Sequence, residues 1–291
     1  MTGADDWFAV DALRPGVWQI AEPGHVASFL VAGDERAALI DTGMGVRPIR
    51  PVVEALTDKP VIVVNSHHHM DHVGGNHEFD EIAIHESGAE RLAAGASLEI
   101  MPAYVEYARA AWAAFSAYER ADRQFFHQLT DARRLRPLPP GFSADGWSIA
   151  PTQATELLRD GDAIELGGRA LRVIHAPGHS SDGIVLDLVG EGILFGGDTV
   201  NTGAVYLQTP DSDAAVFADV MDSLAARADS WELVTCCHWL VTLVGPEMLR
   251  AQARAARAVC DGDVQYFAAD DCLGNTVREA RFDGFSFLLP A

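Results

Sequence analysis

Short apolar runs separated by turn residues dominate the first quarter of the chain. Three of these runs, at 17–20, 27–32 and 37–40, predict strands, and the acidic turn between the last two predicts a hairpin. A continuous apolar run at 61–64 predicts a fully buried strand. The segment before it begins with prolines and has apolar residues at helical spacing, so it predicts a short helix, with apolar positions Val52, Val53 and Leu56 after Pro48 and Pro51.

The pattern changes between residues 97 and 126, where alanine and aromatic residues recur at helical spacing until several prolines interrupt them. With its irregular tail this segment predicts a helical insertion over 97–150. Strand patterns then return and alternate with two amphipathic helices. The expected strands lie at 163–166, 171–174, 184–188, 193–195 and 233–236, and the helices near 217–224 and 246–260. We interpret 1–291 as one domain of mixed sheet and helix.

Two segments resemble each other weakly. Residues 28–42 and 183–199 both show a strand, an acidic turn, a second strand and then Asp-Thr. Two related halves would place Asp41 and Asp198 at equivalent strand ends, and a chance likeness of two hairpins is the alternative.

The charge balance limits the kinds of partner. The chain has 42 acidic and 21 basic residues and a net charge of −21, which repels nucleic acid and anionic membranes. No apolar run is long enough to cross a bilayer, no signal peptide is visible, and the four cysteines form no disulfide framework. We therefore expect a cytoplasmic protein that acts on a small molecule, with no nucleic acid or membrane partner.

Five titratable side chains occupy the six positions from His67 to His72, directly after the buried run at 61–64. In an extended segment residues two apart project to the same side, so His67 and His69 can converge while His68 faces elsewhere. A turn after them would bring Asp71 and His72 to a second point nearby. A solvated polar loop is the alternative, but the carboxyl end of a strand is where open α/β sheets build sites.

Further along the chain, three more residues of kinds that commonly bind metals follow predicted strands: His179, Asp198 and His238. Each of these residues, taken alone, is consistent with an ordinary polar side chain whose hydrogen bonds are satisfied at the start of a loop. Together with the first cluster they predict a metal site.

These residues, in this order, resemble the ligand motifs of the metallo-β-lactamase superfamily. The resemblance implies a four-layer αββα sandwich of the α/β class. It implies that His67, His69 and His179 hold one metal and that Asp71, His72 and His238 hold the other. Asp198 would bridge the two, and Asp41 would support the ligands. With an aspartate at the bridging position, the chain resembles the hydroxyacylglutathione hydrolase, lactonase and thioesterase branches of this superfamily.

The resemblance further implies a dinuclear metallohydrolase with two Zn²⁺, although Fe or Mn also suits these ligands. Attack by a metal-bridging hydroxide would cleave an ester, lactone or thioester, with Asp71 and Asp198 as catalytic residues. A mono-iron oxidoreductase similar to persulfide dioxygenases and a phosphodiesterase are the alternatives.

The helical insertion departs from compact members of the family. We expect its aromatic residues to form an apolar lid over a substrate pocket, namely Tyr104, Tyr107, Trp112, Phe115 and Tyr118. Packing on the core, or a homodimer surface, is the alternative.

Overall fold

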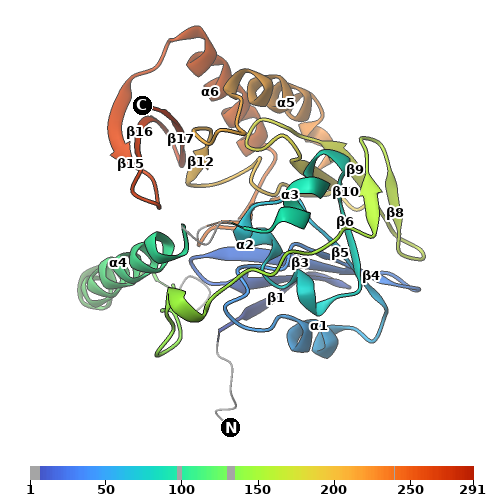
Figure 1. The fold of residues 1–291 in the computed structure, drawn as a ribbon. Helices are drawn as coiled ribbons and strands as arrows, with labels where there is room; N and C mark the ends of the chain where they lie inside the picture. Colours follow the sequence, from blue (N-terminus) through green and yellow to red (C-terminus); the bar gives the residue numbers. More distant parts are fainter. Residues whose placement is uncertain (1–6, 97–99, 130–134, 239) are drawn as a thin grey trace.

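Two β-sheets face each other in the computed structural model, which describes residues 7–96, 100–129, 135–238 and 240–291 (Figure 1). The first sheet has its strands in chain order: β1 (Ala9–Arg14), β2 (Val17–Glu22), β3 (Val26–Ala32), β4 (Ala37–Ile40), β5 (Val61–Val64), β6 (Glu81–His85) and β7 (Glu156–Leu158). The second has the order β14 (Leu243–Val244), β13 (Leu233–Thr235), β11 (Ile193–Phe195), β10 (Ile184–Leu188), β9 (Ala170–His175) and β8 (Ala163–Glu165).

The main core lies between these sheets, where the buried rings of Phe29 and Phe195 have centroids 5.5 Å apart. Helices lie outside both sheets. On the side of the first sheet is α1 (Arg50–Leu56), and on the side of the second are α5 (Ala214–Ala226) and α6 (Glu247–Asp261) (Figure 1). The predicted four-layer sandwich is therefore confirmed.

The early part of the chain folds as its apolar pattern predicts. β3 and β4 form an antiparallel hairpin, and β4 then pairs with β5 in parallel across α1. Pro51 stands in the first turn of α1, where its missing N–H costs no helical hydrogen bond. β1, β6 and β7 were not predicted.

The weak internal likeness corresponds to a repeated topology. β10 and β11 form an antiparallel hairpin like β3 and β4, and β11 then pairs in parallel with β13, as β4 does with β5. Asp41 and Asp198 lie just past the ends of β4 and β11. The structure favours two related halves over a chance likeness.

A third sheet was missed by the sequence analysis, which ended its strands at residue 236. It has the order β12 (Ala204–Tyr206), β17 (Phe285–Pro290), β16 (Thr276–Phe282) and β15 (Tyr266–Asp270). A second core joins it to α5, α6 and the second sheet, with the rings of Phe217 and Phe287 5.5 Å apart. The Asp283-Gly284 turn between two apolar segments was the available hairpin signal.

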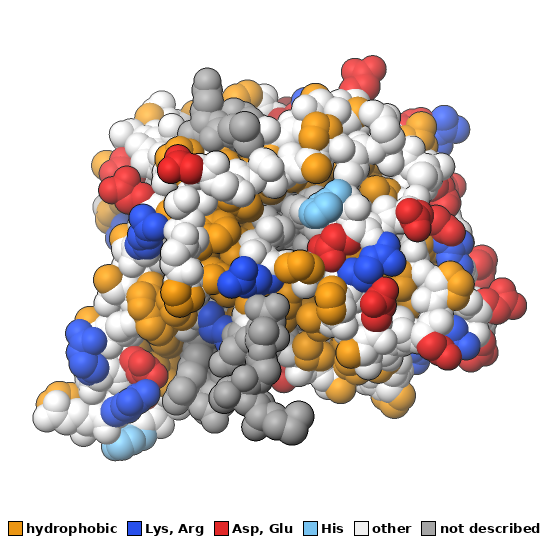
Figure 2. Space-filling model, turned by 60° about the horizontal axis from the view of Figure 1, so that its bottom comes forward, with side chains coloured by type: hydrophobic (Ala, Val, Ile, Leu, Met, Phe, Trp, Pro, Cys, Tyr) orange, Lys and Arg blue, Asp and Glu red, His pale blue; other side chains and the backbone are white. Residues whose placement is uncertain are grey.

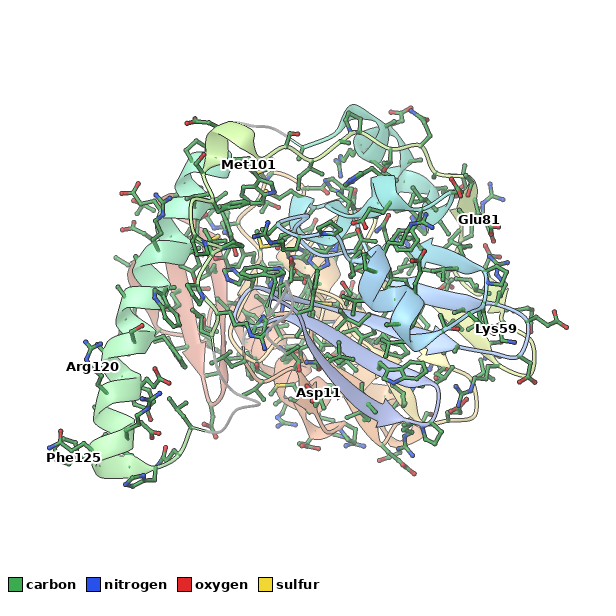
Figure 3. The ribbon with its side chains drawn as sticks, turned by 90° about the horizontal axis from the view of Figure 1, so that it is seen from below. Asp11, Lys59, Glu81, Met101, Arg120 and Phe125 are labelled. Atoms are coloured by element: carbon green, nitrogen blue, oxygen red, sulfur yellow. The ribbon has the colours of Figure 1, made fainter. Side chains whose placement is uncertain are left out.

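The predicted helix over 97–126 forms as α4 (Met101–Ala121), which continues into a short π-helical turn, Asp122–Phe126; residues 97–99 lie outside the described residues. The buried residues of α4 all lie in its first eight positions, and the rest of the helix projects from the body (Figures 1 and 3). Within the described ranges, no helix combines the length and apolar composition needed to cross a bilayer.

Candidate metal centre

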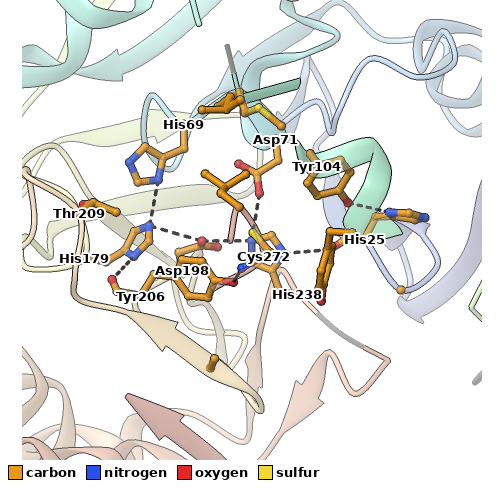
Figure 4. A pocket seen from close by; sticks show the side chains of 16 residues that line it. His25, His69, Asp71, Tyr104, His179, Asp198, Tyr206, Thr209, His238 and Cys272 are labelled. Atoms are coloured by element: carbon orange, nitrogen blue, oxygen red, sulfur yellow. Dashed lines mark hydrogen bonds and ion pairs between the residues drawn. The ribbon is translucent and has the colours of Figure 1, made fainter. Parts of the chain in front are cut away.

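The seven predicted ligands come from four loops that meet at one edge of the sandwich, and Figure 4 labels five of them, His69, Asp71, His179, Asp198 and His238. His67 and His69 lie in the loop after β5, and α2 (Met70–Val73) starts immediately afterwards, so its first turn places Asp71 and His72 beside them. The other three loops follow β9, β11 and β13. β9 and β11 are both antiparallel to β10, and β13 is parallel to β11, so these three strands end at the same edge.

The ligand atoms fall into the two groups that the resemblance implies. Those of His67, His69 and His179 lie within 4.8 Å of one another, and so do those of Asp71, His72 and His238. The structure thus brings together all the residues expected to surround the two metals.

Asp198 lies between the two groups. Its Oδ2 is 3.1 Å from Nε2 of His238 and 3.4 Å from Nε2 of His179. Its Oδ1 is 3.2 Å from Nε2 of His72. One carboxylate therefore reaches imidazoles of both groups, which is the geometry a bridging ligand requires.

Several buried atoms of the cluster lie close together and have no hydrogen-bond partner. They include Nε2 of His67, Nε2 of His72 and Oδ1 of Asp198. Buried polar atoms without partners are costly, and three together at one point indicate a bound species that would satisfy them. Imidazole nitrogens and carboxylate oxygens suit zinc, so the residues present fit a pair of metal ions.

The pKa values differ between the two groups. Burial, reinforced by neighbouring imidazoles, holds the pKa of His67 and His69 well below the usual value, so both rings are neutral with a free lone pair. Burial also lowers the pKa of His72 and His238, but the negative charge of Asp198, its polar contacts with the two rings and the charges of the neighbouring aspartates together outweigh burial. The pKa of His72 is raised well above its usual value and that of His238 to about 9. Metal binding would therefore displace protons from these two rings.

Hydrogen bonds that Nδ1 donates orient three of the rings so that Nε2 faces the cluster. His72 donates to Oδ2 of Asp41 at 2.8 Å, His179 donates to the carbonyl of Tyr206 at 2.8 Å, and His238 donates to the carbonyl of His25 at 2.8 Å. Such partners fix the tautomer and orientation of metal-binding histidines.

Asp41 is fully buried and adopts a positive φ of 60°, which is uncommon outside glycine. Its Oδ1 accepts from the backbone N–H of Ser66 at 2.7 Å, and its Oδ2 accepts from the hydroxyl of Ser66 at 2.7 Å as well as from His72. Asp41 thus fixes both Ser66, the residue just before the first ligand His67, and the imidazole ring of His72.

We expect Asp41→Asn to lower metal affinity and activity by roughly 10- to 100-fold, because an amide NH₂ cannot accept from these donors. Titration of the metal-free variant with zinc checks this. Unchanged affinity would mean that Asp41 only fills space.

A cavity of about 260 Å³ opens over the cluster. Outside the expected ligands its lining is mainly apolar and aromatic. Tyr104, Tyr107 and Ile100 form one wall, and the third sheet supplies Tyr206 and the turn residues Cys272 and Leu273 (Figure 4).

Only two of the five aromatic residues expected to form a lid reach this cavity, Tyr104 and Tyr107. Trp112, Phe115 and Tyr118 are not among its lining residues, because they lie further along α4, where the helix leaves the body. The structure therefore places only the first two of the five predicted lid residues, Tyr104 and Tyr107, at the cavity.

Several residues of the site were missed by the sequence analysis. His25 and Tyr206 orient ligands through backbone carbonyls, which any residue type can supply, so no sequence signal identified them. Cys272 lies in the turn between β15 and β16 of the unpredicted third sheet. His68 faces away from the cluster, as expected, and its Nδ1 lies 2.9 Å from the buried Asp182.

An αββα sandwich with histidines and aspartates gathered at one edge defines a class of proteins with a candidate metal site at that edge. The chain belongs to the metallo-beta-lactamase superfamily, whose model matches residues 21–233. It is 31% identical over 241 residues to the acyl-coenzyme A thioesterase MBLAC2 of Homo sapiens, covering 77% of each chain. It is also 31% identical over 157 residues to a hydroxyacylglutathione hydrolase of Gloeobacter violaceus, covering 53% of this chain and 41% of that protein.

Solved structures show the same fold. The sec-alkylsulfatase Pisa1 from a Pseudomonas species superposes with a TM-score of 0.62 at 15% identity, over 88% of this chain and 42% of that one. A metallo-beta-lactamase from Pontibacter korlensis superposes with a TM-score of 0.57 at 18% identity, over 86% of this chain and 99% of that one. The family, the fold and enzymatic function predicted from the sequence are thus confirmed.

Proposed function

We propose that this protein is a di-zinc hydrolase that cleaves thioesters whose acyl group is neutral and apolar. The observation that carries the proposal is an apolar cavity directly above two groups of metal-ligand atoms that share one carboxylate. The similarity to a protein named as an acyl-coenzyme A thioesterase supports the choice of thioester over ester or lactone.

The lining of the cavity supports a neutral acyl group. Among the described residues that line it, none is lysine or arginine, so apart from the metal centre itself a carboxylate or phosphate inside would meet no cationic side chain. Tyr107, Ile100 and Leu273 offer apolar contact instead. The acyl chain would therefore enter the cavity, and the polar part of the thiol would remain outside.

Phosphodiesters and glutathione derivatives fit less well for the same reason. Basic side chains are scattered on the face that Figure 2 shows, and among the described residues there they form no continuous patch.

The residues of the cluster suit hydrolysis. The seven ligands would hold two zinc ions, which when bound would supply hydroxide at neutral pH and polarise the acyl carbonyl. Asp71, with 24% of its side chain exposed, lines the cavity and can accept a hydrogen bond from the attacking water. Asp198 holds the two groups of histidines in one geometry. The water oxygen joins the acyl carbon, the carbon–sulfur bond breaks, and the proton ends on the departing sulfur, so that an acid and a thiol are released.

A substrate panel tests this proposal. Zinc-loaded protein is assayed with apolar acyl thioesters, acyl thioesters that carry a terminal carboxylate, lactones, aryl esters and a phosphodiester. We expect kcat/KM for apolar acyl thioesters to exceed that for each other class by about 10-fold or more, since a 1.4 kcal/mol preference suffices. Turnover of the phosphodiester alone would overturn the carbonyl assignment. A single bound iron with oxygen consumption would favour the oxidoreductase.

A further inference from the structure

We propose that the helical insertion positions one half of the metal centre, with Tyr104 acting through His25 on His238. The inference rests on the proposed function in one respect, because it takes His238 as a metal ligand. Tyr104 and His25 are then positioning residues for the second group, Asp71, His72 and His238.

The turn between β2 and β3 sets the position of His238 directly. The carbonyl of His25 accepts from Nδ1 of His238, and the next residue, Val26, forms an isolated antiparallel bridge with His238. The backbone N–H of Ala27 donates to the carbonyl of Cys237 at 2.7 Å. Both the ring and the backbone of His238 therefore follow the backbone of residues 25–27.

The insertion holds the other side of the same turn. Nδ1 of the His25 ring lies 2.7 Å from the hydroxyl of Tyr104 on α4, and Nε2 lies 3.2 Å from the carbonyl of Arg136. Since a carbonyl only accepts, Nε2 carries the hydrogen. His25 and Tyr104 are both buried, with 7% and 8% of their surfaces exposed, so water does not compete freely for these bonds.

The turn has little room to move outward. The backbone N–H of Arg136 donates to the carbonyl of Pro23 at 3.0 Å. Gly24 has a φ of +85°, and a Cβ there would lie 2.6 Å from Cγ of Leu135. The returning end of the insertion thus closes on the turn, and a shift of the insertion is transmitted to the carbonyl that orients His238.

The first group of ligands is oriented by other contacts. His179 donates to the carbonyl of Tyr206, and Nδ1 of His67 lies 3.1 Å from the hydroxyl of Ser66. Loss of the Tyr104 hydroxyl should therefore loosen one metal ion and leave the other held as before. Tyr104 also lines the cavity, so the substrate and the second metal position share one support.

The test measures zinc release without any substrate. Full-length zinc-loaded protein is mixed with a chromogenic chelator, and the two release phases are followed for the wild type and for Tyr104→Phe. Tyr107→Phe is the matched control, because it removes a tyrosine hydroxyl from the same helix and the same cavity. His25→Phe is a second variant that removes both ring bonds and keeps a ring against Trp7, whose centroid lies 5.2 Å away.

We expect one phase to become about 10-fold faster or more in Tyr104→Phe and in His25→Phe, with the other phase unchanged. Tyr107→Phe should match the wild type. Equal acceleration of both phases, or equal release from Tyr104→Phe and Tyr107→Phe, would overturn the inference. Failure of the wild type to hold two ions would instead contradict the proposed function.

Discussion

Replacing Asp198 with alanine is expected to lower kcat/KM by at least about 100-fold and to reduce bound zinc below two ions per chain. Residues that only support ligands already cost 10- to 100-fold when they are lost, and Asp198 reaches both ligand groups directly. Its removal would also leave His72 and His238 without the negative charge that raises their pKa values. Steady-state kinetics and metal analysis on the same sample measure both effects.

Two further variants make this result specific. Asp198→Asn keeps the shape and removes the charge, so it should also lose activity if the carboxylate binds metal. Asp229→Ala is the control, because that side chain is 97% exposed and pairs only with Arg250 among the contacts described. An Asp198→Ala protein that keeps two ions and wild-type activity would show that this aspartate does not bridge.

Removing the metal is expected to abolish hydrolysis and to lower the melting temperature by roughly 5–10 °C. A ligand present at 1,000 times its Kd stabilises the folded state by about 4 kcal/mol. For a chain of 291 residues the unfolding entropy is about 0.6 kcal/mol/K, so each kcal/mol shifts the Tm by roughly 1.5–2.5 °C. The physical cause is the group of buried atoms that lack partners in the metal-free cluster, Nε2 of His67 and His72 and Oδ1 of Asp198.

Dialysis against a chelator followed by thermal unfolding measures this shift. Adding zinc back should restore both activity and Tm, which separates metal loss from irreversible damage. The same treatment of Asp198→Ala should change its Tm less. If the chelator left the activity and Tm of the wild type unchanged, the hydrolysis would not depend on a removable metal.

The candidate ligands could be predicted from the sequence because they are side chains of distinctive type at the ends of apolar runs. His67 and His69 follow a continuous buried run, and Asp198 follows another. The direction of each strand then decides whether the loops meet. The first hairpin and the strand, helix and strand after it were predicted from apolar spacing and turn residues, and the structure shows that β4 and β5 pair in parallel, which places the cluster at the carboxyl edge of the sheet.

The surroundings of the cluster were harder to predict for two physical reasons. The carbonyls of His25 and Tyr206 orient ligands. Because every residue has a backbone carbonyl, the residue types at these positions do not reveal this role. Helical spacing along α4 identified an aromatic face, but it did not show where the helix leaves the body of the protein. Tyr104 and Tyr107 lie before that point and reach the cavity, whereas Tyr118 lies beyond it. The third sheet was missed although it supplies a cavity wall.

We propose that seven side chains from four loops of this chain hold two metal ions. Elemental analysis of untagged protein, purified without chelator, tests it most directly. We expect about two zinc ions per chain in the wild type and fewer in Asp198→Ala. A wild-type protein that contains no transition metal and takes up none from zinc-containing buffer would contradict it.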